Sequence, residues 1–475
     1  MKRSGKIVFT LLFFALLFTA RQSKATHAFG AQLTYTCINS NTYVIWYTLY
    51  RDCSGIFPAT TILINITNTC GFPAQSMNIP QVVSPIDLSP MCPQDVPTTC
   101  QGGIHMGVQK YIYSDTIVLG GACSNWKISH AESSRSSSLT TITGAGSDDL
   151  YVYCMINNTV GVNNSPVFTA EPGLYVCLGA PFSIDQGYFD VDGDSLTMQM
   201  ITPLITAGSI VSYFSGYSGT QPLISNPPMS FNPVTGVLSG NPVQADFSVY
   251  AILVNEYRNG VLIGQVERDL SLIARSCTNN QPDMSGFDNT ANYNITVLPN
   301  VQSCFTIGSF DPDAGQFTNI VLANSMSGLS FSHTSGDLDT ATVCWTPTMS
   351  DSLNNPNCFT LEVTDDACPF TLTVSRTYCI DVSLIDNISK TETPSFEVYP
   401  NPFTENLLLT TDQSSEYEIN MYDLSGREVH YEKFSGKTHQ LNPTALESGV
   451  YLISIRDLNI SSSPLWNRLV FRGIK

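Results

Sequence analysis

The distribution of cysteine constrains the fold of this chain more than any other feature of its sequence. All fourteen cysteines lie between Cys37 and Cys379, and the residues after Cys379 contain none. They form two even groups, eight up to Cys177 and six from Cys277 onward, which suggests separate modules stabilised by disulfides. A metal site is not supported, because no CxxC pair is present and the six histidines are scattered. The pairing of the cysteines stays open.

The N-terminal segment, residues 1–25, has the three parts of a secretory signal peptide. Positive residues over Lys2–Lys6 precede an apolar run, Ile7–Ala20, and Ser23–Ala25 supplies small residues at a cleavage site. The apolar run is shorter than the ~20 residues that a membrane-spanning helix needs, and no other stretch approaches that length. We therefore expect export, an oxidising compartment and no transmembrane helix in the mature chain.

The composition is typical of an exported all-β protein. Charged residues make up only 13% of the chain, while 32 Gly and 27 Pro punctuate short apolar runs. A formal net charge of −18 opposes binding to nucleic acid. At roughly 100–200 residues per domain, the length predicts three or four domains.

The first module, residues 26–172, opens with a predicted β-hairpin. Gln32–Cys37 and Tyr43–Tyr50 are its two strands, joined by a polar turn. The phrases Leu49–Gly55 and Asp149–Cys154 resemble the amino-terminal module of large cell-surface and gliding-associated proteins of Bacteroidota. That resemblance implies an adhesin-like surface protein but does not identify a ligand.

The second module, residues 173–277, has two phrases typical of immunoglobulin-like or cadherin-like repeats. Phe189–Leu196 is an acidic corner that precedes a strand, and Met229–Gly240 contains an Asn-Pro-x-Thr-Gly turn between two strands. The pair Asn259-Gly260 predicts a tight hairpin near the end of the module. This length is sufficient for a two-sheet immunoglobulin-like sandwich.

The third module, residues 278–385, repeats the acidic corner as Phe310–Gly315. Because the two acidic phrases occupy matching places, we interpret modules two and three as diverged copies of one immunoglobulin-like fold. Residues 386–395 are polar and form a predicted linker to the last domain.

The C-terminal stretch, residues 396–475, lacks cysteine and is expected to be a small β-sandwich. Polar and apolar residues alternate over Glu416–Met421, which indicates a half-buried strand. The phrases Tyr399–Phe403, Tyr422–Val429 and Ser448–Leu452, in this order, resemble the type A C-terminal sorting domain of Bacteroidota. The resemblance implies recognition by the type IX secretion machinery and delivery across the outer membrane to the cell surface or the medium.

Alternate aspartates in the two acidic phrases are candidate metal ligands. Asp190, Asp192 and Asp194 surround a glycine, and several carboxylates around such a turn suit calcium, which prefers oxygen ligands. Asp311 and Asp313 form a poorer copy that we expect to bind calcium more weakly. The alternative, in which these residues only cap an exposed turn, stays open.

Motifs for catalysis are absent from the sequence. It contains no Gly-x-Ser-x-Gly elbow, no His-Glu-x-x-His and no phosphate-binding glycine loop. We therefore predict no catalytic residues, no organic cofactor and a non-catalytic binding or adhesion protein with a glycan or protein ligand. The alternatives are a secreted hydrolase acting on glycan or peptide, and a passive structural spacer.

Overall fold

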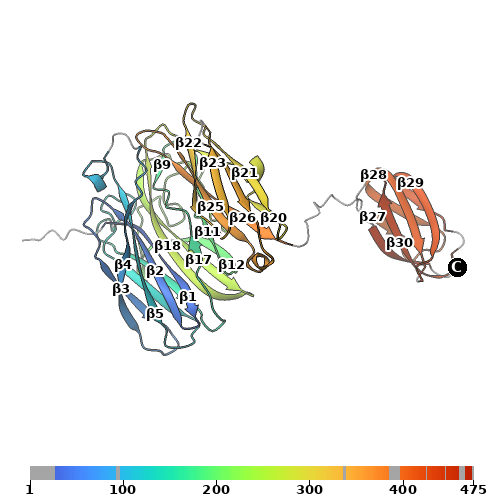
Figure 1. The fold of residues 1–475 in the computed structure, drawn as a ribbon, viewed down its shortest axis with the longest axis horizontal. Coiled ribbons are helices and arrows are strands. Elements are labelled where there is room, and N and C mark those ends of the chain that lie inside the picture. The colour runs from blue at the N-terminus through green and yellow to red at the C-terminus, as the bar shows by residue number, and fades with distance from the viewer. Residues whose placement is uncertain are drawn as a thin grey trace, which may run out of the picture. The chain divides into compact units, whose positions relative to one another are not determined.

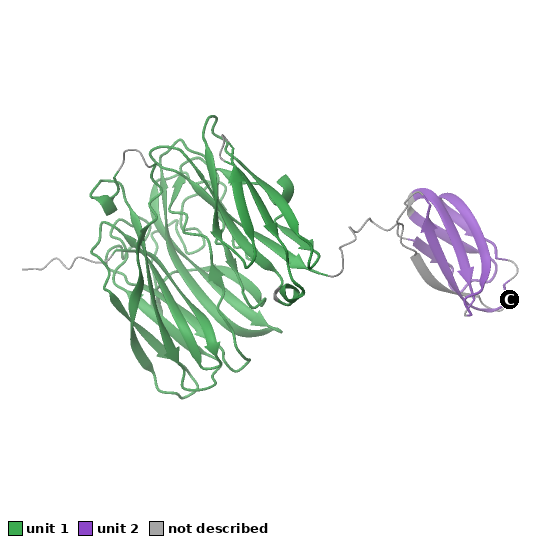
Figure 2. Ribbon diagram, in the orientation of Figure 1, with its two compact units in different colours: residues 1–384 green, residues 385–475 purple. Residues whose placement is uncertain are grey.

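The computed structural model describes residues 27–92, 97–334, 338–383, 396–423, 425–443, 446–458 and 466–472. The chain forms two compact units, Met1–Leu384 and Ile385–Lys475 (Figure 2). The predicted signal peptide and linker lie outside the described residues. The described residues form strands and short 3-10 helices without an α-helix, so the all-β prediction is confirmed. The 3-10 helices are η1 (Thr99–Gln101), η2 (Phe287–Asn289) and η3 (Met349–Asn354).

The largest sheet of the first unit combines strands from both of the first two predicted modules (Figure 1). In order across the sheet its strands are β12 (Ser195–Ile201), β17 (Asp246–Arg258), β18 (Val261–Arg275), β1 (Ala28–Asn39), β2 (Thr42–Asp52), β5 (Val108–Val118), β4 (Gln75–Asp87), β3 (Thr61–Thr67), β6 (Trp126–Glu132), β7 (Leu150–Ile156), β13 (Leu204–Thr206) and β14 (Ser209–Ile210). A further strand, β9 (Tyr175–Cys177), runs parallel to β18. The predicted first hairpin is confirmed, since β1 and β2 pair antiparallel.

Strand β18 closes part of this sheet into a ring. It pairs with β1 at Leu270 and with β7 at Val266, so that β18, β1, β2, β5, β4, β3, β6 and β7 follow one another and return to β18. The predicted boundary after residue 172 is therefore wrong as a boundary between folded units. The two predicted modules share one sheet because the edges of β1 and β7 need hydrogen-bond partners, and a strand of the second module supplies them.

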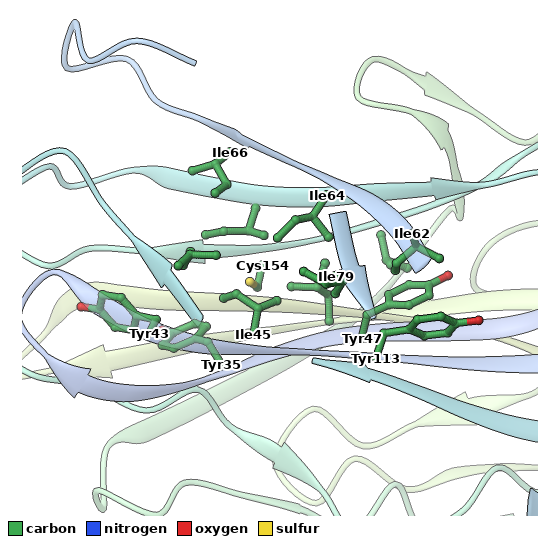
Figure 3. Packing of buried hydrophobic residues seen from close by; sticks show 14 of the residues in the cluster. Tyr35, Tyr43, Ile45, Tyr47, Ile62, Ile64, Ile66, Ile79, Tyr113 and Cys154 are labelled. Carbon is green, nitrogen blue, oxygen red and sulfur yellow. The ribbon is translucent and has the colours of Figure 1, made fainter. Parts of the chain in front are cut away.

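The interior of the ring is packed with tyrosine and isoleucine. Figure 3 shows Ile62 of β3 beside the rings of Tyr47 and Tyr113. Alternation along β3 accounts for this packing: its isoleucines are buried while the residues between them are exposed. The free thiol of Cys154 lies in the same core.

A second core lies around the hairpin of β17 and β18. The predicted turn at Asn259-Gly260 joins them, with φ of 52° and 77°, as a type I′ turn requires. Leu270 and Leu272 of β18 belong to this core, together with Phe29 of β1. Two small sheets flank it, composed of β10 (Phe182–Ile184), β16 (Leu238–Gly240) and β15 (Ser230–Phe231), and of β11 (Tyr188–Phe189) and β8 (Val167–Phe168).

The third predicted module is a two-sheet sandwich. One sheet contains β19 (Asp283–Met284), β21 (Ser303–Phe310), β24 (Thr340–Trp345) and β23 (Ser330–Thr334). The other contains β20 (Asn294–Val297), β26 (Thr373–Val382), β25 (Asn357–Asp365) and β22 (Thr318–Asn324). Their inner faces share one core, in which Val343 and Trp345 of the first sheet meet residues such as Phe359 and Tyr378 of the second.

Disulfides tie the modules of the first unit together. The six bridges are Cys53–Cys100, Cys70–Cys123, Cys92–Cys368, Cys177–Cys277, Cys304–Cys344 and Cys358–Cys379. Disulfide bonding is as predicted, but the separation into two closed groups is wrong. Cys92–Cys368 and Cys177–Cys277 each join one group to the other, and Cys37 and Cys154 are free thiols.

The second unit is one bent five-stranded sheet. Its strands are β27 (Phe396–Tyr399), β28 (Leu407–Tyr422), β29 (Glu428–Leu441), β30 (Gly449–Asp457) and β31 (Trp466–Arg472). The predicted alternation is confirmed, because Tyr417, Ile419 and Met421 are fully buried in the core of this unit. The long strand β28 pairs with β27 along its first part and with β30 along its last, so both parts share that core.

Candidate functional site

The first acidic corner is a turn organised by its own backbone. It joins β11 to β12, and the Asp190 side chain accepts hydrogen bonds at Oδ1 from the backbone N–H groups of Asp192 (2.9 Å) and Asp194 (3.0 Å). Gly193 has a φ of 78°, in the left-handed region where a side chain would be strained. The predicted turn-capping role of Asp190 is therefore present in the structure.

Two asparagines that precede the corner in the sequence, Asn163 and Asn164, are hydrogen-bonded to its carboxylates. Asn164 donates its backbone N–H to Oδ2 of Asp192 at 2.7 Å and its side-chain amide to Oδ1 at 2.9 Å. The preceding Asn163 donates its amide to Oε2 of Glu256 at 2.8 Å. Because of these contacts, the second module begins at Asn163, before the predicted start at residue 173.

The carboxylates that converge differ from the predicted set. Asp190, Asp194 and Glu256 each bring one oxygen within 4.8 Å of the others. Asp192 is not part of this group, because Asn164 holds its side chain. Residue spacing does not point to Glu256, because this residue reaches the corner only through the pairing of β17 with β12, which puts Glu256 opposite Leu196.

Burial controls the charge of this cluster. Glu256 is 0% exposed and Asp190 6%. Two buried oxygens, Oδ2 of Asp190 and Oε1 of Glu256, accept no hydrogen bond from an N–H or hydroxyl group of the described residues. Burial, with a further contribution from the Asp190 carboxylate, raises the pKa of Glu256 to about 10. Glu256 is therefore protonated at neutral pH. Its O–H group can donate a hydrogen bond to the Asp190 carboxylate.

Arg258 supplies a built-in positive charge. Its guanidinium donates to both carboxylate oxygens of Asp194, from Nε at 2.9 Å and from Nη2 at 2.5 Å, and Nη2 also donates to Oδ1 of Asn163 at 2.9 Å. The corner can thus hold a cation through Asp190, Asp194 and Glu256, but that cation has to compete with a guanidinium and a proton.

The second acidic corner repeats the same contacts in the third module. Asn280 donates its backbone N–H and its amide to the two oxygens of Asp313, at 2.7 and 2.8 Å, and Asp313 donates its backbone N–H to Oδ1 of Asp311 at 2.8 Å. Asn279 donates its amide to Oδ2 of Asp365 at 2.8 Å. These shared contacts support the interpretation of the two modules as diverged copies.

The second corner has an amide where the first has a guanidinium. Gln316 donates to Oδ1 of Asn279 at 3.0 Å, the contact that Arg258 makes to Asn163 in the first copy. Burial raises the pKa of Asp365 to about 6. The predicted pair Asp311 and Asp313 is therefore part of a larger polar cluster, as in the first corner.

A groove of about 620 Å³ lies beside the first corner, between the second repeat and the third module. Strands β11 and β12 contribute to one wall and β20 and β26 to the other. Its lining residues are Ser183, Asp185, Tyr188, Phe189, Asp190, Gly193, Asp194, Leu196, Val234, Thr235, Val237, Tyr293, Asn294, Pro356, Cys358, Arg376, Thr377 and Cys379. This volume falls in the range of roughly 300–1,000 Å³ that is usual for ligand sites.

The predicted Asn-Pro-Val-Thr-Gly turn forms a lip of the groove. The Tyr188 hydroxyl donates to the carbonyl of Val234, which fixes the turn against β11. Gly236 has a φ of 70°, and a Cβ there would lie 2.4 Å from the Tyr188 ring. Glycine is therefore required at this position, and the side chain of Val234 is left 78% exposed at the lip.

Comparison with known families decides the nature of the second unit. Residues 397–464 match the family model described as "Secretion system C-terminal sorting domain". The second unit is a type IX secretion sorting domain. This sorting domain marks the protein as a type IX substrate that is delivered to the cell surface or the extracellular space, and it implies contact with the secretion machinery. The predictions of route and localisation are confirmed.

Solved structures with detectable similarity include the immunoglobulin domains of Dscam1, N-cadherin EC1-3 and PorU. The first four immunoglobulin domains of Dscam1 are 10% identical, with 94% of this chain and 99% of that chain covered and a TM-score of 0.22. Drosophila N-cadherin EC1-3 is 14% identical, with 50% and 77% covered and a TM-score of 0.19. Dimeric latent PorU from Porphyromonas gingivalis is 13% identical with a TM-score of 0.16, and the match covers 64% of this chain but only 32% of PorU.

TM-scores this low carry no argument about function. Among curated proteins, no sequence matches the chain significantly. In the described part of the chain, no helix has the length and apolar character needed to span a bilayer.

Proposed function

We propose that this type IX substrate is a non-catalytic binding protein whose ligand enters the groove between the second repeat and the third module. The observation that carries the proposal is the groove itself. Aromatic rings from both walls, Tyr188, Phe189 and Tyr293, line a cavity of ligand size.

The walls of the groove are anchored in a way that suits a preformed site. Arg376 forms a 2.8 Å ion pair with Asp283, and Asp185 accepts the backbone N–H groups of Gly187 at 2.9 Å and of Thr377 at 3.1 Å. The bond from Thr377 crosses between the two modules. A groove whose walls are already bonded to each other loses little conformational entropy when a ligand binds.

The test compares the mature protein with a variant in which the groove is filled. Thr235 is exposed at the lip, so Thr235→Trp adds bulk there without a core change, and Thr61→Trp at an exposed position of β3 is the matched control. Binding to glycan arrays and to cell surfaces should fall at least tenfold for the first variant and stay unchanged for the second.

Three outcomes contradict the proposal. Equal binding by Thr235→Trp would show that the ligand binds elsewhere. Release of products from polysaccharide or peptide substrates would favour the secreted hydrolase. An absence of any binding by the unaltered protein would favour the passive spacer.

A further inference from the structure

We infer that the groove takes an extended peptide segment that carries a Lys or Arg side chain. This inference rests on the proposed function, because it names the ligand class of the same groove. Three features of the described residues carry it: the charge of the lining, the nature of the apolar wall, and the strand that borders the groove.

The charge of the lining is negative. Asp185, Asp190 and Asp194 line the groove, against one basic residue, Arg376. Arg376 is already paired with the carboxylate of Asp283 at 2.8 Å. Its positive charge is therefore committed to an acidic residue that lies outside the lining.

The ion pairs of the groove leave an excess of carboxylates. Arg258 pairs with Asp194 and Arg376 with Asp283, so Asp185 and Asp190 line the groove without an ion pair to any described residue. A positive group that enters the groove is attracted by this excess, whereas a phosphate, sulfate or carboxylate is repelled. The net charge of −18 acts in the same direction at longer range.

The apolar wall suits the rest of a basic side chain. Tyr188, Phe189 and Tyr293 are aromatic lining residues, and aromatic rings attract an ammonium or guanidinium group. Leu196 and Val237 offer aliphatic surface for the methylene stem of Lys or Arg. A neutral sugar would gain contact with the rings but nothing from the excess of carboxylates.

The border strand favours a peptide over a small amine. Among the described strands, β20 pairs with β26 only and so lies at the edge of its sheet, and its first residue, Asn294, lines the groove together with the adjacent Tyr293. An edge strand is a template for the backbone of an extended peptide, which adds main-chain hydrogen bonds to the side-chain contacts.

The test uses the mature protein and three capped, fluorescently labelled pentapeptides, Gly-Leu-X-Leu-Gly, in which X is Lys, Gln or Glu. Fluorescence anisotropy should show binding of the Lys peptide, about tenfold weaker binding of the Gln peptide and none of the Glu peptide. Binding of the Lys peptide should also weaken as the salt concentration rises, because part of the attraction is electrostatic.

Charge variants at exposed positions connect the result to the groove. Thr235→Arg and Asn294→Arg each place a positive charge at its rim and should weaken binding of the Lys peptide at least tenfold, while Thr61→Arg on β3 should not. Circular dichroism of each variant establishes that it is folded.

The outcomes separate the two proposals. Equal or tighter binding of the Gln or Glu peptide, or unchanged binding in both rim variants, overturns the ligand class. If no peptide binds but Thr235→Trp still abolishes binding on a glycan array, the proposed function stands and the peptide inference is wrong. If that variant changes no binding at all, both are wrong.

Discussion

The buried salt bridge between Arg135 and Asp269 tests whether the first two predicted modules form one folded unit. Both residues are 0% exposed, and Nη1 and Nη2 of Arg135 donate to the two oxygens of Asp269 at 2.9 and 2.5 Å. Arg135 follows β6 in the predicted first module, and Asp269 lies in β18 of the second. Asp269→Asn removes the carboxylate that is hydrogen-bonded to the buried guanidinium, which should lower the free energy of unfolding by about 3–5 kcal/mol.

Urea unfolding followed by tryptophan fluorescence measures this change, because Trp126 is fully buried in the core of the ring. The double variant Arg135→Met/Asp269→Leu should lose less stability than Asp269→Asn, since no unpaired charge remains. Asp115→Asn makes the same chemical change at an exposed position of β5 and should stay within about 0.5 kcal/mol. A loss below about 1 kcal/mol for Asp269→Asn would refute the reasoning.

Three further predictions concern export, calcium and cross-linking. Removal of residues 396–475 should retain a folded protein in the periplasm, and normal appearance outside the cell on fractionation would contradict this. If calcium binds the first corner through Asp190, Asp194 and Glu256, Glu256→Gln should abolish the calorimetric heat at millimolar calcium while Asp192→Asn should keep most of it; equal effects would reject this ligand set. Replacing Cys92 and Cys368 by Ser should destabilise the first unit by about 2–5 kcal/mol, because this bridge closes a long loop, and an unchanged urea midpoint would reject that estimate.

Local patterns in the sequence predicted local structure well. The alternation over Glu416–Met421 and the turn at Asn259-Gly260 depend on backbone periodicity and on the conformations that Asn and Gly tolerate. Both are properties of a few neighbouring residues, so a single sequence contains them. The order of short phrases in the sorting domain is informative for the same reason.

Long-range pairing could not be read in this way. The apolar pattern of Val261–Arg275 shows that the strand is buried but not that it bonds to β1 and β7 of the preceding module. The cysteine groups misled for a related reason: an even count fits closed groups, yet Cys92 pairs with Cys368 in the other group. Strand partners and disulfide partners are set by the three-dimensional core, which the periodicity of one strand does not contain.

The acidic corner shows the same division within a single site. Asp190 and Asp194 lie four residues apart in the sequence and converge in the structure, whereas Asp192 lies outside the group because Asn164 bonds to its oxygens. Glu256 enters from a strand more than sixty residues later, through cross-strand register alone. Residue spacing thus located the turn, whereas the membership of the cluster depended on the sheet.

The contrast between the two corners bears on which of them is better suited to a cation. In the first, carboxylate oxygens converge within 4.8 Å, but Arg258 already neutralises Asp194. In the second, Gln316 takes the place of the guanidinium, so no positive side chain makes that contact, yet Asp311 and Asp313 are not part of a comparably tight group among the described residues. Geometry favours the first corner and charge favours the second. Because a divalent ion needs several oxygens at bonding distance before its charge can be used, geometry outweighs charge here, and the first corner remains the stronger candidate even though it has to release a guanidinium.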